Sequence, residues 1–159
     1  TEQDPEYALA FEQMGLIYAA KKDKRAPDFY QTALRLNPNS PTVLYNLGLY
    51  YQNNNQPEKA IEVFQDLLNK NPTYAYAAYN IGFIKSEIYK KPDQALEWFN
   101  KARSIQPEYA EAHYMAGYCQ EALGKKQEAI NAYRQTLNVN PAFAMARQAL
   151  TRLGAEHDK

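Results

Sequence analysis

Residues 41–74 read PTVLYNLGLYYQNNNQPEKAIEVFQDLLNKNPTY, and this stretch decides the fold. Its landmarks are Gly48, Ala60 and Pro72. The same residue types recur at a nearly constant spacing of 34 or 35 positions, as Gly82 and Gly117, as Ala95 and Ala129, and as Pro38, Pro107 and Pro141. A period of this length, with a glycine-centred and an alanine-centred segment closed by proline, is typical of a solenoid of helix pairs. The chain is therefore predicted to be an array of one repeated unit.

Local signals inside this stretch predict a helix, a turn and a second helix. Ser40 followed by Pro41 is typical of an N-cap and a first helical residue. The three asparagines 53–55 end that helix, because asparagine tolerates the left-handed backbone conformation that follows a helix. Pro57 then begins a second helix, which ends near Pro72. The unit is predicted to be a hairpin of two antiparallel helices.

The repeats predict one continuous array over residues 1–159, with hairpins at about 8–40, 41–74, 75–109 and 110–143. In the first hairpin Gly15 and Ala26 are one position closer together than their counterparts, so its second helix is expected to start late, at about Pro27, and to end at Leu36. In the third hairpin the turn is predicted to be one residue longer, around Lys90 and the two residues after it.

Both ends of the array carry their own signals. Asp4 and Pro5 are expected to open the first helix. Residues 144–153 are predicted to form a capping helix, and residues 154–159 a frayed tail. Polar residues interrupt the apolar positions of the capping helix, as expected of a polar lid that keeps an open-ended solenoid soluble. These residues are Arg147, Gln148, Thr151 and Arg152.

Composition argues against several classes of partner. Lys and Arg number 18, and Asp and Glu also number 18, so the chain lacks the basic surface that a nucleic-acid phosphate backbone requires. The apolar stretches are shorter than the roughly 20 residues that span a bilayer, so membrane insertion is not expected. The single cysteine, Cys119, is expected to be an ordinary buried thiol and leaves no cysteine-built metal site. Neither a metal nor another cofactor is expected.

Nothing in the sequence predicts an enzyme. His113 falls on the expected core face of its helix, and no Ser, His and Asp set or glycine-rich phosphate loop accompanies it. Localisation is left open. Thr1 is followed by polar residues instead of a basic and apolar leader, which indicates a processed or trimmed chain. A cytoplasmic location is weakly preferred, and an exported or periplasmic one is retained as an alternative.

With these residues in place, the chain resembles the tetratricopeptide repeat (TPR) family over about residues 8–153. The family's columns are matched by Leu47 with Gly48, and by Tyr51, Ala60, Phe64 and Pro72. There are local departures, since Lys85 and Gln120 stand where the other repeats have Tyr18 and Tyr51. The resemblance implies an all-α, right-handed α-solenoid of four TPR hairpins plus the capping helix. It also implies that the first helix of each hairpin lines a concave groove.

Two faces of each first helix can be separated by advancing about 100° per residue from its glycine. The core face holds Leu44, Leu47, Gly48 and Tyr51 and their equivalents. A second arc, at offsets −6, −3, −2, +1, +4 and +5, lies on the opposite side and becomes the predicted peptide-binding groove, about three repeats long. Its candidate residues are Tyr45, Asn46, Leu49, Tyr76, Tyr79, Asn80, Phe83, Glu87, Glu111, Tyr114, Met115 and Tyr118.

The chemistry of this arc suits a peptide. Asn46 and Asn80 recur one repeat apart, and each amide can both donate and accept hydrogen bonds from a bound main chain. Tyrosines supply contact area at a low entropy cost. Glu87, Glu111 and Glu121 would favour a ligand that carries Lys or Arg. Two plainer interpretations stay open, in which the tyrosines only pack between neighbouring helices and the asparagines only bridge helices or contact solvent.

The sequence therefore predicts a non-enzymatic protein–protein interaction scaffold that binds an extended or helical segment of a partner protein in its concave groove. The alternative is a structural module that assembles with copies of itself, through the exposed solenoid ends or the aromatic concave face.

Overall fold

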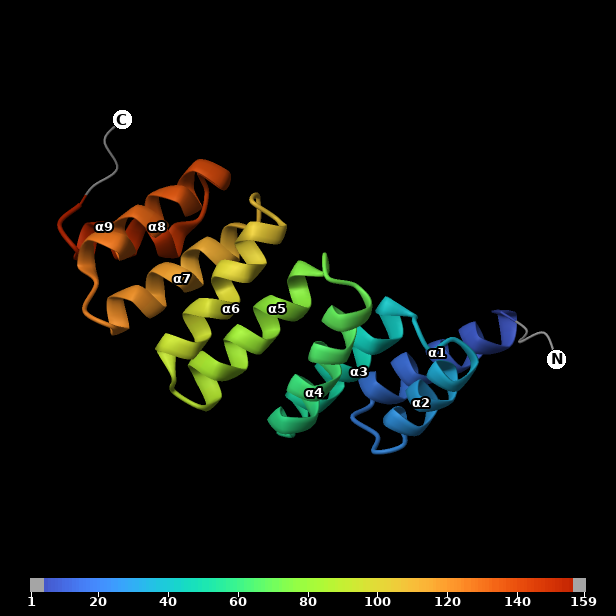
Figure 1. Ribbon diagram of the computed structural model, residues 1–159. Helices are drawn as coiled ribbons and strands as arrows, with labels where there is room; N and C mark the ends of the chain where they lie inside the picture. Colours follow the sequence, from blue (N-terminus) through green and yellow to red (C-terminus); the bar gives the residue numbers. More distant parts are fainter. Residues whose placement is uncertain (1–4, 156–159) are drawn as a thin grey trace. The chain divides into compact units, whose positions relative to one another are not determined.

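The computed structural model describes residues 5–155, and these form antiparallel helix pairs joined by short loops (Figure 1). No strand occurs within this range. The all-α fold of four helix hairpins and a terminal helix is confirmed. Its elements are α1 (Pro5–Ala20), α2 (Ala26–Leu36), α3 (Pro41–Asn53), α4 (Pro57–Lys70), α5 (Ala75–Phe83), the π-helix η1 (Ile84–Ile88), α6 (Pro92–Ile105), α7 (Ala110–Ala122), α8 (Lys126–Val139) and α9 (Ala144–Arg152).

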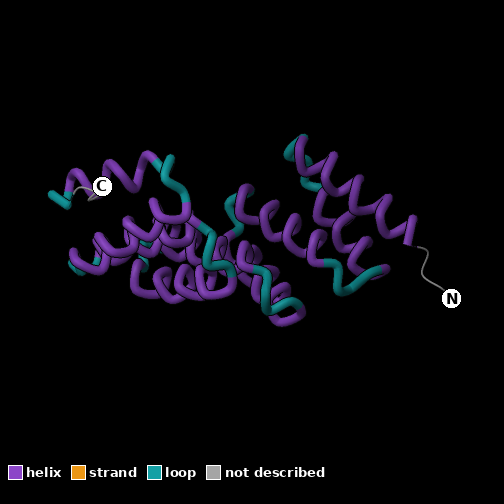
Figure 2. Tube along the Cα trace, turned by 90° about the horizontal axis from the view of Figure 1, so that it is seen from above, coloured by secondary structure: helices purple, strands orange, loops and turns teal. Residues whose placement is uncertain are grey.

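The chain forms two compact units, Thr1–Pro72 and Thr73–Lys159. Helices α1 to α4 belong to the first unit and α5 to α9 to the second. Within each unit, every second helix packs against the first helix of its own hairpin, and the tube view in Figure 2 shows the loops that connect them. The prediction of a single continuous array stays a prediction.

In every hairpin the glycine of the first helix lies directly against an aromatic ring of the second helix. A Cβ added to Gly82 would lie 2.9 Å from Phe99 Cε1, and one added to Gly117 would lie 2.8 Å from Tyr133 Cε1. The glycine column therefore marks the closest approach of the two helices, and the aromatic column fills the space beside it. The same contact pairs Gly15 with Tyr30 and Gly48 with Phe64.

The helix ends follow the predicted signals. The side-chain oxygen of Ser40 accepts a hydrogen bond from the backbone amide of Val43 at 3.3 Å, as an N-cap does. In the turn after α3, Asn55 adopts a φ of 56°, the left-handed conformation for which asparagine is suited. In the first hairpin α2 begins at Ala26, the column alanine itself. Its second helix therefore starts late, as predicted, although one residue before the expected Pro27.

The third hairpin places its additional residue differently from the prediction. Gly82 and Ala95 are thirteen positions apart, whereas the corresponding residues of the fourth hairpin are twelve apart. The left-handed turn residue Lys90 precedes Ala95 by the usual five positions, so the predicted longer turn is wrong. The π-helix takes up the extra residue instead, and the amide of Tyr89 donates to the carbonyl of Ile84 at 3.1 Å. A π-helix adds one residue inside a helix and leaves the turn geometry unchanged.

The terminal helix α9 packs its small and apolar residues against α8. Ala146, Ala149 and Leu150 join one buried cluster with Ala129 and Tyr133. The four polar residues predicted to interrupt its apolar positions are all exposed, namely Arg147, Gln148, Thr151 and Arg152. Two sequence expectations fall outside the described residues, namely the role of Asp4 at the start of α1 and the fraying of residues 156–159.

Candidate functional site

The predicted core face is buried in α3, whereas in α1 its residue Met14 is 38% exposed. In α3, Leu44, Leu47 and Tyr51 are 3%, 4% and 8% exposed. His113, on the same face of α7, is partly buried, and its Nε2 lies 2.8 Å from the carbonyl oxygen of Pro107. The division into a core face and an opposite arc therefore has a physical basis in α3.

In the second unit, the opposite arc is a mixture of exposed and buried side chains. Tyr76 on α5 and Tyr118 on α7 are 44% and 43% exposed, and Glu111 is also exposed. Asn80 and Met115 lie in the interior, at 7% and 9% exposure. The remaining candidates of this unit are half-buried, namely Tyr79, Phe83, Glu87 and Tyr114.

Aromatic rings contact one another along this arc. Tyr109, the residue before α7, lies with its ring centroid 5.0 Å from that of Tyr76 and 5.1 Å from that of Tyr79. Likewise the ring centroid of Phe143, the residue before α9, lies 5.2 Å from that of Tyr114. Packing between repeats therefore accounts for much of the burial of Tyr79 and Tyr114, whereas Tyr76 and Tyr118 keep large exposed areas.

Sequence reasoning missed the residue that precedes each first helix of this unit. In all three cases this residue is aromatic and lies two positions after the column proline. This column could have been found, because it follows the same period of 34 or 35 residues. The missed residues are Tyr74, Tyr109 and Phe143, in line with the prolines at 72, 107 and 141.

The two predicted asparagines differ in their surroundings. The Nδ2 group of Asn80 donates to the backbone carbonyl of Tyr76, one turn earlier in α5, at 2.8 Å. Asn46 is half-buried on α3 and lines a hollow in the first unit. This bond to its own helix was not predicted for Asn80, because the plainer interpretation had the asparagines bridge neighbouring helices or contact solvent.

The acidic residues are less available than the sequence suggested. Glu121 accepts hydrogen bonds from Tyr133 Oη at 2.9 Å and from Arg152 at 2.8 Å, so its charge is matched within the protein. Burial, followed by the bond to this carboxylate, raises the pKa of Tyr133 far above its ordinary value. The Oε2 atom of Glu87 lies 3.6 Å from the Nζ atom of Lys90, so Glu87 also has a cation beside it. The side chain of Glu111 is exposed.

In the first unit, the same arc borders two hollows of about 330 Å³ each. One lies between α1 and α3, where Asn46 and Leu49 face Leu16 and Ala19; Ala20, Lys22, Tyr30, Tyr50, Asn53 and Asn54 complete its lining. We call it the α1–α3 hollow. The sequence analysis missed the contribution of α1, although Leu16 and Ala19 occupy the arc offsets +1 and +4 from Gly15.

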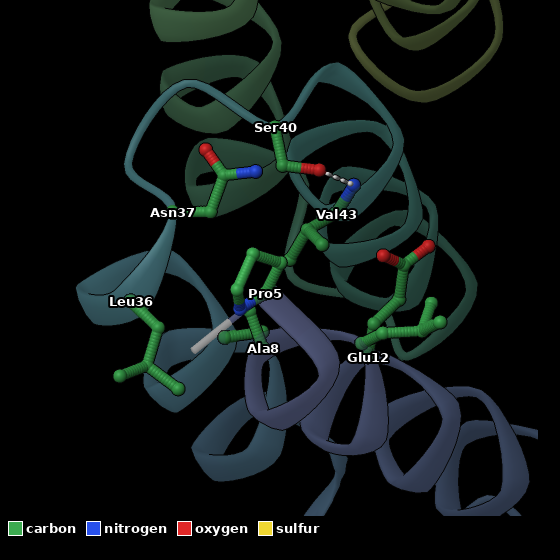
Figure 3. A pocket seen from close by; sticks show the side chains of 9 residues that line it. Pro5, Ala8, Glu12, Leu36, Asn37, Ser40 and Val43 are labelled. Atoms are coloured by element: carbon green, nitrogen blue, oxygen red, sulfur yellow. Dashed lines mark hydrogen bonds between the residues drawn. The ribbon is translucent and has the colours of Figure 1, made fainter. Parts of the chain in front are cut away.

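The second hollow lies at the other end of the same helices. Figure 3 shows Pro5, Ala8 and Glu12 of α1 around it, together with Val43 near the start of α3. Leu9 also lines it, and its side chain is largely exposed. Apolar lining with a few polar groups is the usual character of a ligand site.

Other kinds of site find no support in the part of the chain that the structure describes. Among residues 5–155, no three His, Cys, Asp or Glu residues gather where a metal ion could be held. None of the described helices is both long and apolar enough to cross a membrane. Cys119 is buried, and burial raises the pKa of its thiol to about 11.

Comparison with known proteins agrees with this architecture. Two models described as tetratricopeptide repeat match residues 29–62 and 89–153. The peroxisomal targeting signal receptor of Saccharomyces cerevisiae is 34% identical over 79 residues, or 49% of this chain and 12% of the receptor. Photosystem I assembly protein Ycf3 of Acaryochloris marina is 33% identical over 90 residues, or 53% of each chain. The chain thus spans about an eighth of the receptor's length and about half of that of Ycf3.

Solved structures extend the likeness to nearly the whole chain. A crystal structure of MamA protein superposes with a TM-score of 0.81 and 26% identity, covering 93% of this chain and 81% of the other. YrrB, described as a TPR protein with an unusual peptide-binding site, superposes with a TM-score of 0.74 and 24% identity, covering 93% and 76%. At that identity the second likeness concerns the fold alone. Together the two matched segments cover more than half of the chain, which belongs to the tetratricopeptide repeat family.

Proposed function

We propose that this protein is a non-enzymatic interaction module that binds an extended or helical segment of another protein on its first helices. TPR repeats mediate protein–protein interactions, typically through an extended surface that successive repeats share. The observation that carries the proposal is the exposure of Tyr76 and Tyr118, two large aromatic side chains on the same arc of α5 and α7. Exposed tyrosines provide contact area and hydroxyl groups at a low entropy cost.

The proposed surface, here called the first-helix surface, keeps the predicted residues and assigns them different parts. Tyr76, Tyr118 and Glu111 offer direct contacts, whereas Asn80 and Met115 support them from the interior. The missed residue Tyr109 joins the surface through its ring contacts. The other members in the second unit are Tyr79, Phe83, Glu87 and Tyr114, and the first unit carries its own part of the predicted set, namely Tyr45, Asn46 and Leu49.

The α1–α3 hollow suggests how the first unit would contribute. Its volume of about 330 Å³ can accommodate a ligand side chain, and Leu16, Ala19 and Leu49 give it an apolar lining. Asn46 at its edge carries an amide that can both donate to and accept from a peptide backbone. A ligand would fit the apolar lining and the amide if one of its apolar side chains entered the hollow and its backbone formed hydrogen bonds with Asn46.

The relatives support the class of ligand. The names of two similar proteins refer to a targeting signal, in the peroxisomal receptor, and to a peptide-binding site, in YrrB. The shared length is only part of the receptor, so the identity of the partner does not transfer.

A display experiment tests the proposal. Peptides are selected from a random peptide library on the immobilised chain, and their affinity is measured by calorimetry. We expect Tyr76→Ala and Tyr118→Ala each to weaken binding about tenfold or more, since aromatic side chains that become buried in a complex often contribute above 1 kcal/mol to the binding free energy. Both tyrosines are exposed, so circular dichroism should be unchanged.

The matched control is Leu123→Ala, because Leu123 follows α7 directly, is 37% exposed and lies outside the first-helix surface. This variant should bind the selected peptides as the native chain does. Selected peptides whose affinity survives both tyrosine substitutions but falls with Leu123→Ala would contradict the proposal.

A second candidate function is assembly with further copies of the chain. It is favoured by one observation, the exposure of large apolar side chains along α1, where Tyr7 and Ile17 are more than half exposed. Contiguous apolar surface of this kind commonly marks an interface.

A further inference from the structure

The lining of the α1–α3 hollow combines apolar side chains with one cation. Leu16, Ala19 and Leu49 are apolar, and Lys22 carries the only charge among the ten residues that line the hollow. Lys22 lies two positions beyond the end of α1, in the loop that leads to α2. All of these residues belong to the first unit. A lining of this kind suits an apolar group that has a negative charge beside it.

The lysines of this loop have no carboxylate partner in the described part of the chain, where no ion pair includes Lys21, Lys22 or Lys24. The acid between them, Asp23, is bound by Arg25. Its Oδ1 accepts from the backbone amide and from Nε of Arg25 at 2.9 and 3.0 Å, and its Oδ2 accepts from Nη2 at 2.8 Å. These bonds lower the pKa of Asp23 to about 2, so the carboxylate stays ionised and paired with Arg25. The charges of the three lysines are left for a ligand.

The loop of Lys22 is attached to the helix on the other side of the hollow. The hydroxyl of Tyr50, on α3, donates to the backbone carbonyl of Asp23 at 3.2 Å, and Tyr50 is only 7% exposed. The Nδ2 group of Asn54 donates in turn to the carbonyl of Tyr50 at 2.8 Å. Both Tyr50 and Asn54 line the hollow. A site whose parts are held together in this way costs less to order around a ligand.

Lys22 differs from the residues at the equivalent turn position of the other hairpins. Each hairpin has one turn residue with a positive φ, between 54° and 74°. Asn55 and Gly124 carry no charge at this position, and the Nζ atom of Lys90 lies 3.6 Å from Oε2 of Glu87. Of these four turn residues, therefore, Lys22 alone presents an unpaired cation. Lysine is also less suited to this backbone conformation than glycine or asparagine, and residues kept in such a conformation are frequent at ligand sites.

We propose that the α1–α3 hollow binds an apolar side chain of the partner segment, and that an acidic residue next to it in that segment pairs with Lys22. Lys22 thereby adds a chemical class to the ligand, an assignment that rests on the function proposed above. The side-chain amides of Asn46 and Asn53 line the hollow and have no hydrogen-bond partner among the described residues, so they can bind the backbone of the segment.

The number of lysines favours acidic side chains over a C-terminal carboxylate. A terminus carries a single negative charge, whereas Lys21, Lys22 and Lys24 together carry three positive charges. Two or more acidic side chains of one segment would match this loop, and their attraction to exposed lysines would weaken with added salt. The sequence expectation of a Lys- or Arg-bearing ligand was drawn from glutamates of the second unit, so it does not describe the first.

A double-mutant cycle tests the pair. Peptides are selected by display on the native chain, and they are expected to carry Asp or Glu beside a large apolar residue. Replacing that acid by its amide should weaken binding about threefold at low salt, as loss of an exposed ion pair does. Lys22→Asn should weaken the acidic peptide by the same factor, and on this variant the amide peptide should lose nothing further. Asparagine occupies the equivalent position at Asn55, so the variant should fold as stably as the native chain, which urea denaturation checks.

The matched control is Lys91→Asn, which removes the same charge from an exposed turn of the second unit. It should leave the affinity for the acidic peptide unchanged. Equal affinities of the Lys22→Asn and Lys91→Asn chains for this peptide would overturn the proposal. A peptide that loses more affinity on amidation of its C-terminus than on replacement of its acidic side chain would assign the charge to the terminus and also overturn it.

Occupancy of the hollow is measured from the methyl signals of Leu16 and Leu49 in a chain labelled at its leucine methyl groups. These signals should shift when the acidic peptide is added, and unchanged signals would overturn the proposal. A peptide that loses affinity with Tyr76→Ala but binds the Lys22→Asn chain as tightly as the native one would overturn the acidic pairing and leave the proposed function intact. If no peptide is selected at all, both are overturned.

Discussion

A single glycine sets the distance between two helices in each hairpin. A Cβ on Gly48 would lie 2.8 Å from Phe64 Cδ1, a contact that real side chains do not make. Helix propensity alone would favour Gly48→Ala by up to about 1 kcal/mol, but overpacking costs about 1–3 kcal/mol. We therefore expect Gly48→Ala to lower the free energy of unfolding, as measured by urea denaturation followed by circular dichroism.

The companion variant Gly48→Ala with Phe64→Leu shows whether the ring is the cause. A smaller side chain at 64 makes room for the new methyl group, so the combined loss should be less than the sum of the two single losses. A chain that Gly48→Ala stabilises would contradict this account of the glycine column.

The thiol of Cys119 gives a second test at the scale of one residue. Burial raises its pKa to about 11, so at pH 8 only about one thiol in a thousand is ionised. We expect iodoacetamide at pH 8 to leave Cys119 unmodified in the native chain and to modify it fully in guanidinium chloride, as followed by mass spectrometry. Rapid modification of the native chain would show that the α7 interior is open.

Burial of single residues was predictable only where the repeat fixes it. The column residues could be assigned to the core from sequence, because each hairpin makes the same contact between its glycine and its aromatic ring. The burial of Asn80 and Met115 could not be predicted, because the position of a residue on the helix predicts the direction of its side chain but not which neighbouring residues cover it. Aromatic residues before the next helix, such as Tyr109, decide how much of that arc is covered.

At the scale of elements, the π-helix η1 makes a prediction of its own. Deleting Ile88 should turn η1 into ordinary α-helix and restore the spacing of the other hairpins, with the free energy of unfolding changed by no more than about 1 kcal/mol. Deleting Leu123 from the regular fourth hairpin is the control, since these residues are 40% and 37% exposed.

The control deletion should be the costly one. It moves Gly124 out of the turn position, where its φ is 74°, and shifts α8 against α7. We expect a fall in melting temperature of at least about 5 °C relative to the Ile88 deletion. Equal losses for the two deletions would mean that η1 does not absorb the additional residue.

A small polar network connects three helices at the end of the second unit. The Glu121 carboxylate accepts from Tyr133 of α8 and from Arg152 of α9. Glu121→Ala would leave a buried tyrosine hydroxyl without its acceptor, which costs about 1–3 kcal/mol. Glu111→Ala, on the exposed side of the same helix, should cost less than about 0.5 kcal/mol in the same denaturation experiment. Equal costs would contradict the structural role of Glu121.

Element boundaries followed from the sequence wherever a single residue enforces them. Pro41 and Pro57 begin helices in the structure as predicted, because proline fixes φ and needs no amide partner in the first turn. Pro92 also begins a helix, although the sequence was expected to place it in a longer turn. The location of the inserted residue could not be derived. Both a longer turn and a π-helix add one residue between Gly82 and Ala95, and the repeat spacing does not distinguish them.

At the scale of the whole molecule, the repeat pattern predicted four hairpins and a terminal helix but not two compact units. The spacing of the prolines continues through the boundary, with 34 positions from Pro38 to Pro72 and 35 from Pro72 to Pro107. A periodic sequence specifies how each hairpin is built and gives no signal for where one compact unit ends and the next begins.

The central claim is that the first helices, and not the second helices, form the binding surface. Chemical-shift mapping of a display-selected peptide on the isotope-labelled chain tests it most directly. We expect the largest changes in the amide signals of α5 and α7, around Tyr76 and Tyr118, and around Asn46 in α3. Changes confined to α6 and α8, for instance at the exposed residues Lys101 and Gln135, would contradict the claim.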